Sequence, residues 1–101
     1  MRITDNQYAA IKAAFATNFL SNDSLWLFGS RIDDSKKGGD IDFYIETHYD
    51  NTLLATEKKL AFLRDLKKRI GDQKIDVVVN ILKNNKQLEI YEEAKQSGII
   101  L

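Results

Sequence analysis

Three aspartates stand where aliphatic residues are more usual. Asp40 and Asp42 begin the alternating segment DIDFYIE, and Asp76 lies within the aliphatic segment KIDVVV. Two residues along a strand separate the backbones of Asp40 and Asp42 by about 6.6 Å and leave both side chains on one face. That spacing suits carboxylates sharing metal ions about 3.5–4 Å apart, as in two-metal phosphoryl-transfer sites. Mg²⁺ is commonly held by one or two carboxylates together with substrate phosphates. The aspartates therefore predict a site for divalent metal.

A solvent-exposed edge strand is the alternative explanation for Asp40 and Asp42, because the Asp-x-Asp pattern is short. Aspartate is depleted in strands, however, and Asp76 needs a second explanation of its own. No Arg or Lys lies within DIDFYIE to offset the two charges. Taken together, the three aspartates favour metal binding over a solvated strand.

Gly29 and Ser30 follow directly after the apolar run LWLF. Glycine lets a backbone come close to a phosphate, and the following amides and the serine hydroxyl can donate to its oxygens. A helix starting at Ser30 would add a favourable partial charge, whereas the alternative is a simple turn with a helix cap. At average residue usage, Gly-Ser, nine residues and Asp-x-Asp should coincide on the order of once in a thousand chains of this length.

The motifs together resemble a known superfamily. The segments LFGSRIDDSKKGGDIDFYIE and KIDVVV are similar to those of the nucleotidyltransferases that include polymerase beta and kanamycin nucleotidyltransferase. The closest resemblance is to the minimal nucleotidyltransferases, often the antitoxin partners of HEPN-domain toxins, and it covers nearly the whole chain. It implies Gly29 and Ser30 on the triphosphate of ATP, and Asp40 and Asp42 on two Mg²⁺ ions. It also implies Asp76 as a third metal ligand, near the acceptor hydroxyl.

Four other residues are weaker candidates. Arg31 could reach a phosphate or could be a surface arginine. His48, the only histidine, is expected to be a solvated loop residue rather than a catalytic base. Glu46 shares the face of Asp42 but lies two pleats along, which favours an edge-strand role. Trp26 is expected in the core rather than as a platform for a base.

The elements that must position these residues follow from periodicity and capping signals. Thr4 and Gln7 predict a capping box, and Gly71 and Gly98 predict two helix ends. We expect helices at 4–19, 51–70 and 86–97, and strands at 25–28, 40–46 and 74–80. This order predicts an α/β (α+β) fold, with a small mixed sheet of about three strands and helices over one face. The core face takes Ile41, Phe43, Ile45, Ile75, Val77 and Val79, and the acidic face is left open.

Composition limits the class of protein. The 101 residues predict a single domain spanning 1–101, with an apolar fraction of 44%. Fifteen basic residues balance fifteen acidic ones, so we expect no nonspecific nucleic-acid binding. There is no cysteine, no apolar run of membrane-spanning length and no apolar signal core near the N-terminus. We therefore expect a cytoplasmic protein.

Three functions fit this pattern. The first is transfer of AMP from ATP to a hydroxyl of a protein acceptor. The resemblance suggests a tyrosine of a HEPN toxin, and with it a hetero-oligomer. The second is a binding module that neutralises its partner by occlusion, for which the apolar tail Ile99–Leu101 and the exposed sheet face offer an interface. The third is a small-molecule nucleotidyltransferase, which the resemblance would lead us to expect with an extra substrate domain.

Overall fold

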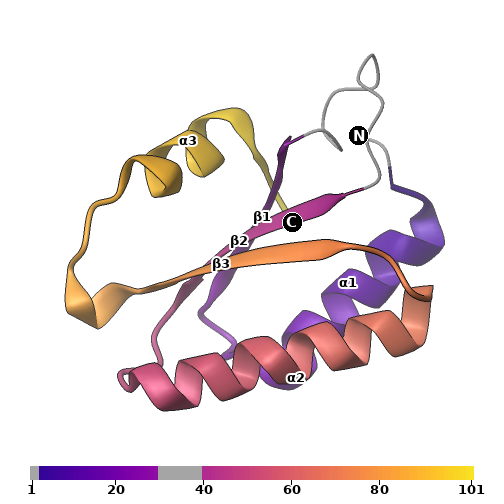
Figure 1. The fold of residues 1–101 in the computed structure, drawn as a ribbon, viewed down its shortest axis with the longest axis horizontal. Helices are drawn as coiled ribbons and strands as arrows, with labels where there is room; N and C mark the ends of the chain where they lie inside the picture. The colour runs from indigo at the N-terminus through magenta and orange to yellow at the C-terminus, as the bar shows by residue number, and fades with distance from the viewer. Residues whose placement is uncertain (1–2, 30–39) are drawn as a thin grey trace.

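The computed structural model describes residues 3–29 and 40–101. Within them the chain forms the helices α1 (Asp5–Asn18), α2 (Thr52–Ile70) and α3 (Glu89–Ser97), and a short 3₁₀ helix, η2 (Leu82–Asn84). The strands are β1 (Ser24–Phe28), β2 (Ile41–Thr47), β3 (Ile75–Ile81) and β4 (Ile99–Ile100) (Figure 1). The α+β fold is confirmed, and the sheet has one strand more than the sequence predicts.

The four strands form one mixed sheet in the order β3-β2-β1-β4. Strand β2 pairs antiparallel with β1 and parallel with β3, and α2 provides the crossover that a parallel pair requires. The apolar tail forms β4, which pairs antiparallel with β1. The tail is held further by the amide of Leu101, which donates to the carbonyl oxygen of Leu25 over 2.8 Å.

Local signals set the ends of the first two helices as the sequence predicts. The amide of Gln7 donates to Thr4 Oγ1 over 3.0 Å, and the amide of Thr4 donates to Gln7 Oε1 over 2.9 Å, which completes the capping box of α1. The side chain of Asn51 caps α2, and Gly71, with a φ of 90°, ends it. These ends fix α2 as a 19-residue crossover.

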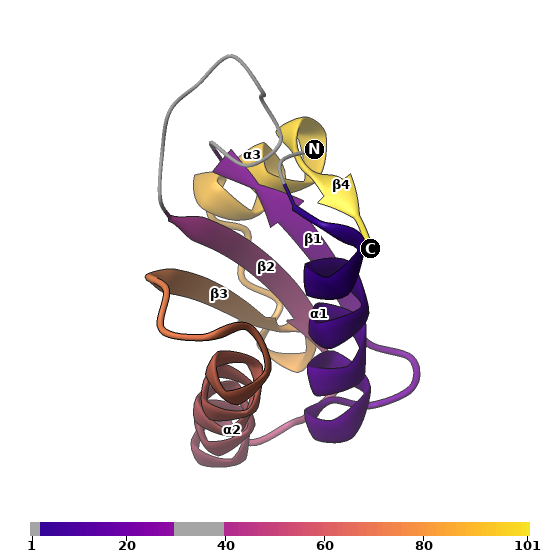
Figure 2. The ribbon, with the colours of Figure 1, turned by 90° about the vertical axis from the view of Figure 1, so that its right-hand side faces the viewer.

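Helices α1 and α2 lie side by side against one face of the sheet (Figure 2). Their apolar side chains form the main core with the inward residues of the strands. The buried members of this core include Ile11, Phe15, Leu27, Phe43, Phe62, Leu66 and Val77. This is the core face that the alternation in β2 and β3 predicts.

Helix α3 lies on the other face of the sheet (Figures 1 and 2), which the sequence led us to expect open. Tyr91 of α3 stacks on Tyr44 of β2 with ring centroids 5.4 Å apart, and Tyr44 is fully buried. A Cβ atom on Gly98 would come within 2.9 Å of the carbonyl oxygen of Leu27, so glycine is needed where α3 ends against β1. The helix covers this face only in part, and the beginning of β3 stays exposed at Asp76.

None of the helices formed by residues 3–29 and 40–101 has the length and apolar character that crossing a membrane requires.

Candidate functional site

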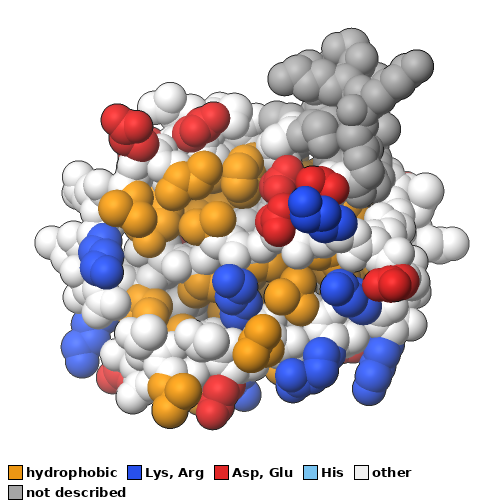
Figure 3. Space-filling model, viewed as in Figure 1, with side chains coloured by type: hydrophobic (Ala, Val, Ile, Leu, Met, Phe, Trp, Pro, Cys, Tyr) orange, Lys and Arg blue, Asp and Glu red, His pale blue; other side chains and the backbone are white. Residues whose placement is uncertain are grey.

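Asp42 and Asp76 lie directly opposite each other on the parallel strands β2 and β3. Parallel pairing in register keeps both side chains on one face of the sheet, which is the face of Tyr44 and Val78 and not that of the main core. Asp42 is half-buried and Asp76 is exposed. Figure 3 shows acidic side chains gathered at one point of the molecular surface, with a basic side chain beside them. The strand register thus brings two of the predicted site residues together.

Asp40 precedes β2, and Lys74 precedes β3 at the corresponding place. The amide of Ile41 donates to the carbonyl oxygen of Lys74 over 3.0 Å, which joins the two strand beginnings. Lys74 Nζ lies 3.5 Å from Asp40 Oδ2, in an ion pair whose side chains are 70% and 44% exposed. The third predicted aspartate therefore lies at the same end of the sheet and is paired with a lysine.

The carboxyl group of Asp42 lies in an unfavourable electrostatic environment. Burial raises its pKa above the ordinary value, the charges of Asp76 and Asp40 raise the pKa further, and Lys74 opposes the rise. No hydrogen bond from the described residues reaches the carboxylate of Asp42 or of Asp76. A cation bound here would relieve this repulsion.

Gly29 ends β1 next to Asp42, because Phe28 and Asp42 are partners in the antiparallel ladder. Its φ is 82°, in the left-handed region that favours glycine. A Cβ atom at this position would collide with the carboxylate of Asp42. Two motifs that are separate in sequence are therefore in contact in the fold. Ser30 and Arg31, the other predicted phosphate-binding residues, lie outside the described residues.

The described residues do not form a complete cation cage. Within residues 3–29 and 40–101, no group of three or more His, Asp or Glu side chains could hold a metal ion by itself. The paired carboxylates of Asp42 and Asp76 nevertheless fit Mg²⁺, which usually takes one or two carboxylates and completes its shell with water and substrate phosphates. The donor set suits a metal that arrives with a nucleotide.

A family model for the nucleotidyltransferase domain matches residues 9–101. The chain belongs to this family. The match runs from α1 to the end of the chain and includes Gly29 and the three aspartates. No curated protein matches the chain significantly. The resemblance to the nucleotidyltransferase superfamily is confirmed, and it supports nucleotidyl transfer as the general activity. Nucleotidyltransferases generally use a nucleoside triphosphate and a divalent metal.

Other polar residues of the nucleotidyltransferase domain have structural partners. His48 Nδ1 lies 2.9 Å from Asp23 Oδ1, and this contact is at the opposite end of β2 from Asp42. Glu46 accepts a hydrogen bond of 2.8 Å from the hydroxyl of Tyr44. Lys95 Nζ lies 3.2 Å from Glu46 Oε2. These contacts give His48 and Glu46 roles in holding the sheet and α3 in place.

Sequence reasoning missed Lys74 as part of the site. It stands two residues before Asp76, so the same alternation that places Asp76 on the open face also places Lys74 there. The sequence therefore contains a signal for Lys74, although this position otherwise predicts only the beginning of a strand. Its ion pair with Asp40 depends on the parallel register of β2 and β3.

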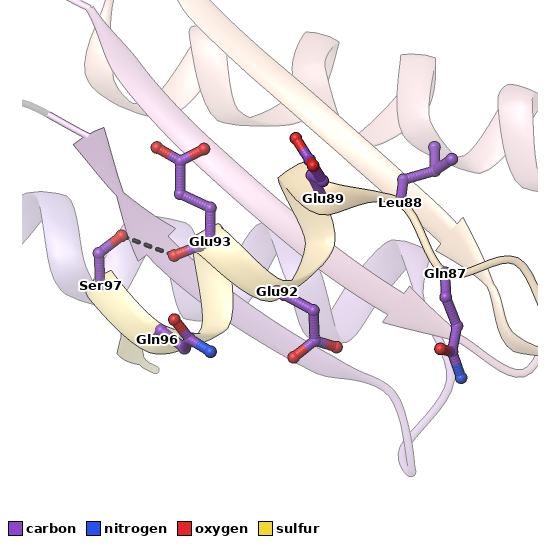
Figure 4. Close-up of a pocket in the computed structure, with 7 residues that line it drawn as sticks. All are labelled: Gln87, Leu88, Glu89, Glu92, Glu93, Gln96 and Ser97. Carbon is purple, nitrogen blue, oxygen red and sulfur yellow. Dashed lines mark hydrogen bonds between the residues drawn. The ribbon is translucent and has the colours of Figure 1, made fainter.

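A shallow hollow of about 470 Å³ lies along the outer side of α3 (Figure 4). Its lining includes Glu89, Glu92 and Glu93, and Ser97 Oγ donates to the carbonyl oxygen of Glu93 over 2.7 Å. The hollow is lined by none of the three aspartates of the candidate site.

Proposed function

We propose that this nucleotidyltransferase transfers AMP from ATP to a hydroxyl group of a protein, with release of pyrophosphate, and that the acceptor is a HEPN-domain toxin which the transfer silences. The observation that carries the chemistry is the in-register pair of Asp42 and Asp76 on the sheet face that α3 covers only in part, together with the contact of Asp42 with Gly29. The antitoxin role rests on the resemblance of the motifs to minimal nucleotidyltransferases.

Each motif residue has a role in this proposal. Asp40 and Asp42 would hold two Mg²⁺ ions, and Asp76 would be a ligand on the acceptor side. Ser30 and Arg31 would donate to the triphosphate, and Gly29 leaves room for it beside Asp42. Bound Mg²⁺ would neutralise phosphate charge and lower the pKa of the acceptor hydroxyl. The chain's own contribution is mainly to position charges, as in other phosphoryl transfers.

The openness of the site favours a large acceptor. Asp76 is exposed on β3, which has β2 as its only neighbour among the described strands. A protein surface could approach Asp76 directly, whereas a small acceptor would need walls that the chain must supply. A protein that brings its own hydroxyl needs no such walls.

Occlusion without catalysis is the second candidate. Ile100 of β4 is 62% exposed, so β4 offers an apolar surface that a partner could cover. The two candidates differ in the need for Asp76, because a carboxylate beside the acceptor contributes mainly in the transition state.

The test is the intact mass of a HEPN-domain protein encoded beside this chain, measured after incubation with the chain, ATP and Mg²⁺. We expect AMP-sized increments with the wild type, and none with Asp76→Asn, which should still bind the partner with near-normal affinity. Asp72→Asn, an exposed aspartate in the turn before β3, is the matched control and should behave as wild type. A partner silenced without any added mass would refute transfer and support occlusion.

A further inference from the structure

Lys74 is a basic residue that lies beside the proposed metal ligands. Its ammonium group pairs with Asp40 at 3.5 Å and also acts on the charge of Asp42. Its backbone is fixed beside the start of β2 by the 3.0 Å hydrogen bond from the amide of Ile41 to its carbonyl oxygen. The side chain therefore starts from a defined point next to the carboxylates.

This pair can neutralise charge without closing the site. The side chain of Lys74 is 70% exposed, and an exposed ion pair is weak, so its ammonium can leave Asp40 at little cost. A lysine is also a flexible point charge, whereas an arginine could bind a carboxylate through two parallel hydrogen bonds. The pairing thus has the strength expected of a temporary counter-charge.

We infer that Lys74 is a place-holding cation, which pairs with Asp40 in the free protein and competes with divalent metal for that carboxylate. Entry of the metal displaces the ammonium group of Lys74 from Asp40. This inference rests on the proposed role of Asp40 as a metal ligand. It predicts that Lys74 weakens the binding of metal alone, whereas a lysine that only contacts phosphate would leave it unchanged.

The chain supplies a closely matched control. Lys83 Nζ lies 3.7 Å from Asp50 Oδ2, and the side chain of Lys83 is 68% exposed. The two lysines thus have similar exposure and similar ion pairs, but only Lys74 pairs with a residue of the candidate site. Substitution of either lysine removes one charge and some surface packing. Any general effect of these losses should therefore appear in variants of both lysines.

The experiment is a titration of the full chain with Mn²⁺ alone, with free Mn²⁺ followed by electron paramagnetic resonance. We expect Lys74→Met to bind Mn²⁺ about threefold to tenfold more tightly than wild type, because both the competitor and its repulsion are removed. Lys83→Met should match wild type, and Lys74→Arg should bind no more tightly than wild type. In metal chelator, Lys74→Met should melt at a lower temperature than Lys83→Met, because it removes one positive charge beside the aspartates.

The outcomes separate this inference from the proposed function. A wild type that binds no Mn²⁺ and shows no stabilisation by ATP with Mg²⁺ would overturn the proposed metal site, and the role of Lys74 with it. A wild type that binds Mn²⁺ with an affinity that Lys74→Met does not increase would overturn the place-holder alone. Weaker Mn²⁺ binding by Lys74→Met would also overturn it.

Discussion

Asp23 and Asp42 lie near opposite ends of β2, and their carboxylates meet opposite surroundings. Asp23 accepts hydrogen bonds from the amide of Leu20, the hydroxyl of Thr47 and the amide of His48, over 2.7–2.9 Å. Its side chain is fully buried. Asp42 receives no hydrogen bond from the described residues, and its nearest charges are mainly negative.

The pKa values of the two groups move in opposite directions. Burial would raise the pKa of Asp23, but hydrogen bonds from His48, Leu20 and Thr47 outweigh it and hold the pKa below its ordinary value of 3.8. At Asp42, burial and the neighbouring Asp76 and Asp40 act together to raise the pKa. The fold thus favours the ionised form of Asp23 and disfavours the ionised form of Asp42.

This difference supports a structural role for Asp23 and the proposed metal-binding role for Asp42. A charge that the fold satisfies completely contributes to stability and leaves nothing for a ligand. A charge left in repulsion costs stability in the free protein, and it can be retained because a ligand relieves it. Substitutions at the two ends of β2 should therefore affect opposite properties.

The largest expected effect is on nucleotide affinity at the Asp42 end. Asp42→Asn should weaken the binding of ATP with Mg²⁺ by about a hundredfold, since even outer-shell substitutions at metal sites cost 10–100-fold. Isothermal titration calorimetry measures this directly. The ligand-free variant should melt no lower than wild type, because asparagine keeps the shape and removes repulsion. Unchanged affinity would mean that the nucleotide binds elsewhere.

The next effect is on stability at the Asp23 end. Asp23→Ala should lower the free energy of unfolding by about 3 kcal/mol, because it leaves the hydroxyl of the buried Thr47 and the partly buried amide of Leu20 without an acceptor. Urea unfolding measures this change, and Asp50→Ala, which removes one exposed ion pair, should cost less than about 1 kcal/mol. Under conditions where Asp23→Ala is folded, its affinity for ATP with Mg²⁺ should equal that of wild type. If Asp23→Ala lost affinity for ATP with Mg²⁺ but kept its stability, this result would contradict the structural role of Asp23.

The smallest effect is a pH dependence. Because the pKa of Asp23 is lowered in the folded state, its ionised form stabilises the fold above the ordinary pKa of 3.8, and this contribution disappears as the pH falls through the folded value. The stability of wild type relative to Asp23→Asn should therefore be constant near neutral pH and shrink in acid. Urea unfolding from about pH 6 to about pH 3 measures it. A difference that grows in acid would contradict the lowered pKa.

Sequence reasoning predicted the elements well because their signals are local. The capping box at Thr4, the cap at Gly71 and the alternation of DIDFYIE each act over a few residues. The contact of Gly29 with Asp42 and the network of Asp23 with Thr47 depend instead on the pairing of β1 with β2, which joins residues far apart in the sequence.

The fourth strand and the position of α3 also lie beyond local signals. Ile99 and Ile100 are too few residues to show the alternation of a strand. The sequence therefore does not indicate whether this tail pairs with the sheet. Tyr91 and Ala94 gave α3 an apolar side, but nothing local indicates which face of the sheet it covers. The alternation predicted that Asp42 and Asp76 lie on an open face opposite the main core. It could not predict that α3 covers part of this face and leaves Asp76 exposed.

The close approach of Gly29 to Asp42 has an evolutionary consequence. A side chain at position 29 would displace the carboxylate of Asp42, so mutations at the two positions cannot have independent effects. A descendant that had lost its activity and replaced Asp42 with a smaller residue would be freed from the collision, though the φ of 82° would still disfavour most replacements. The two positions should therefore drift as an epistatic pair, with Asp42 changing before Gly29.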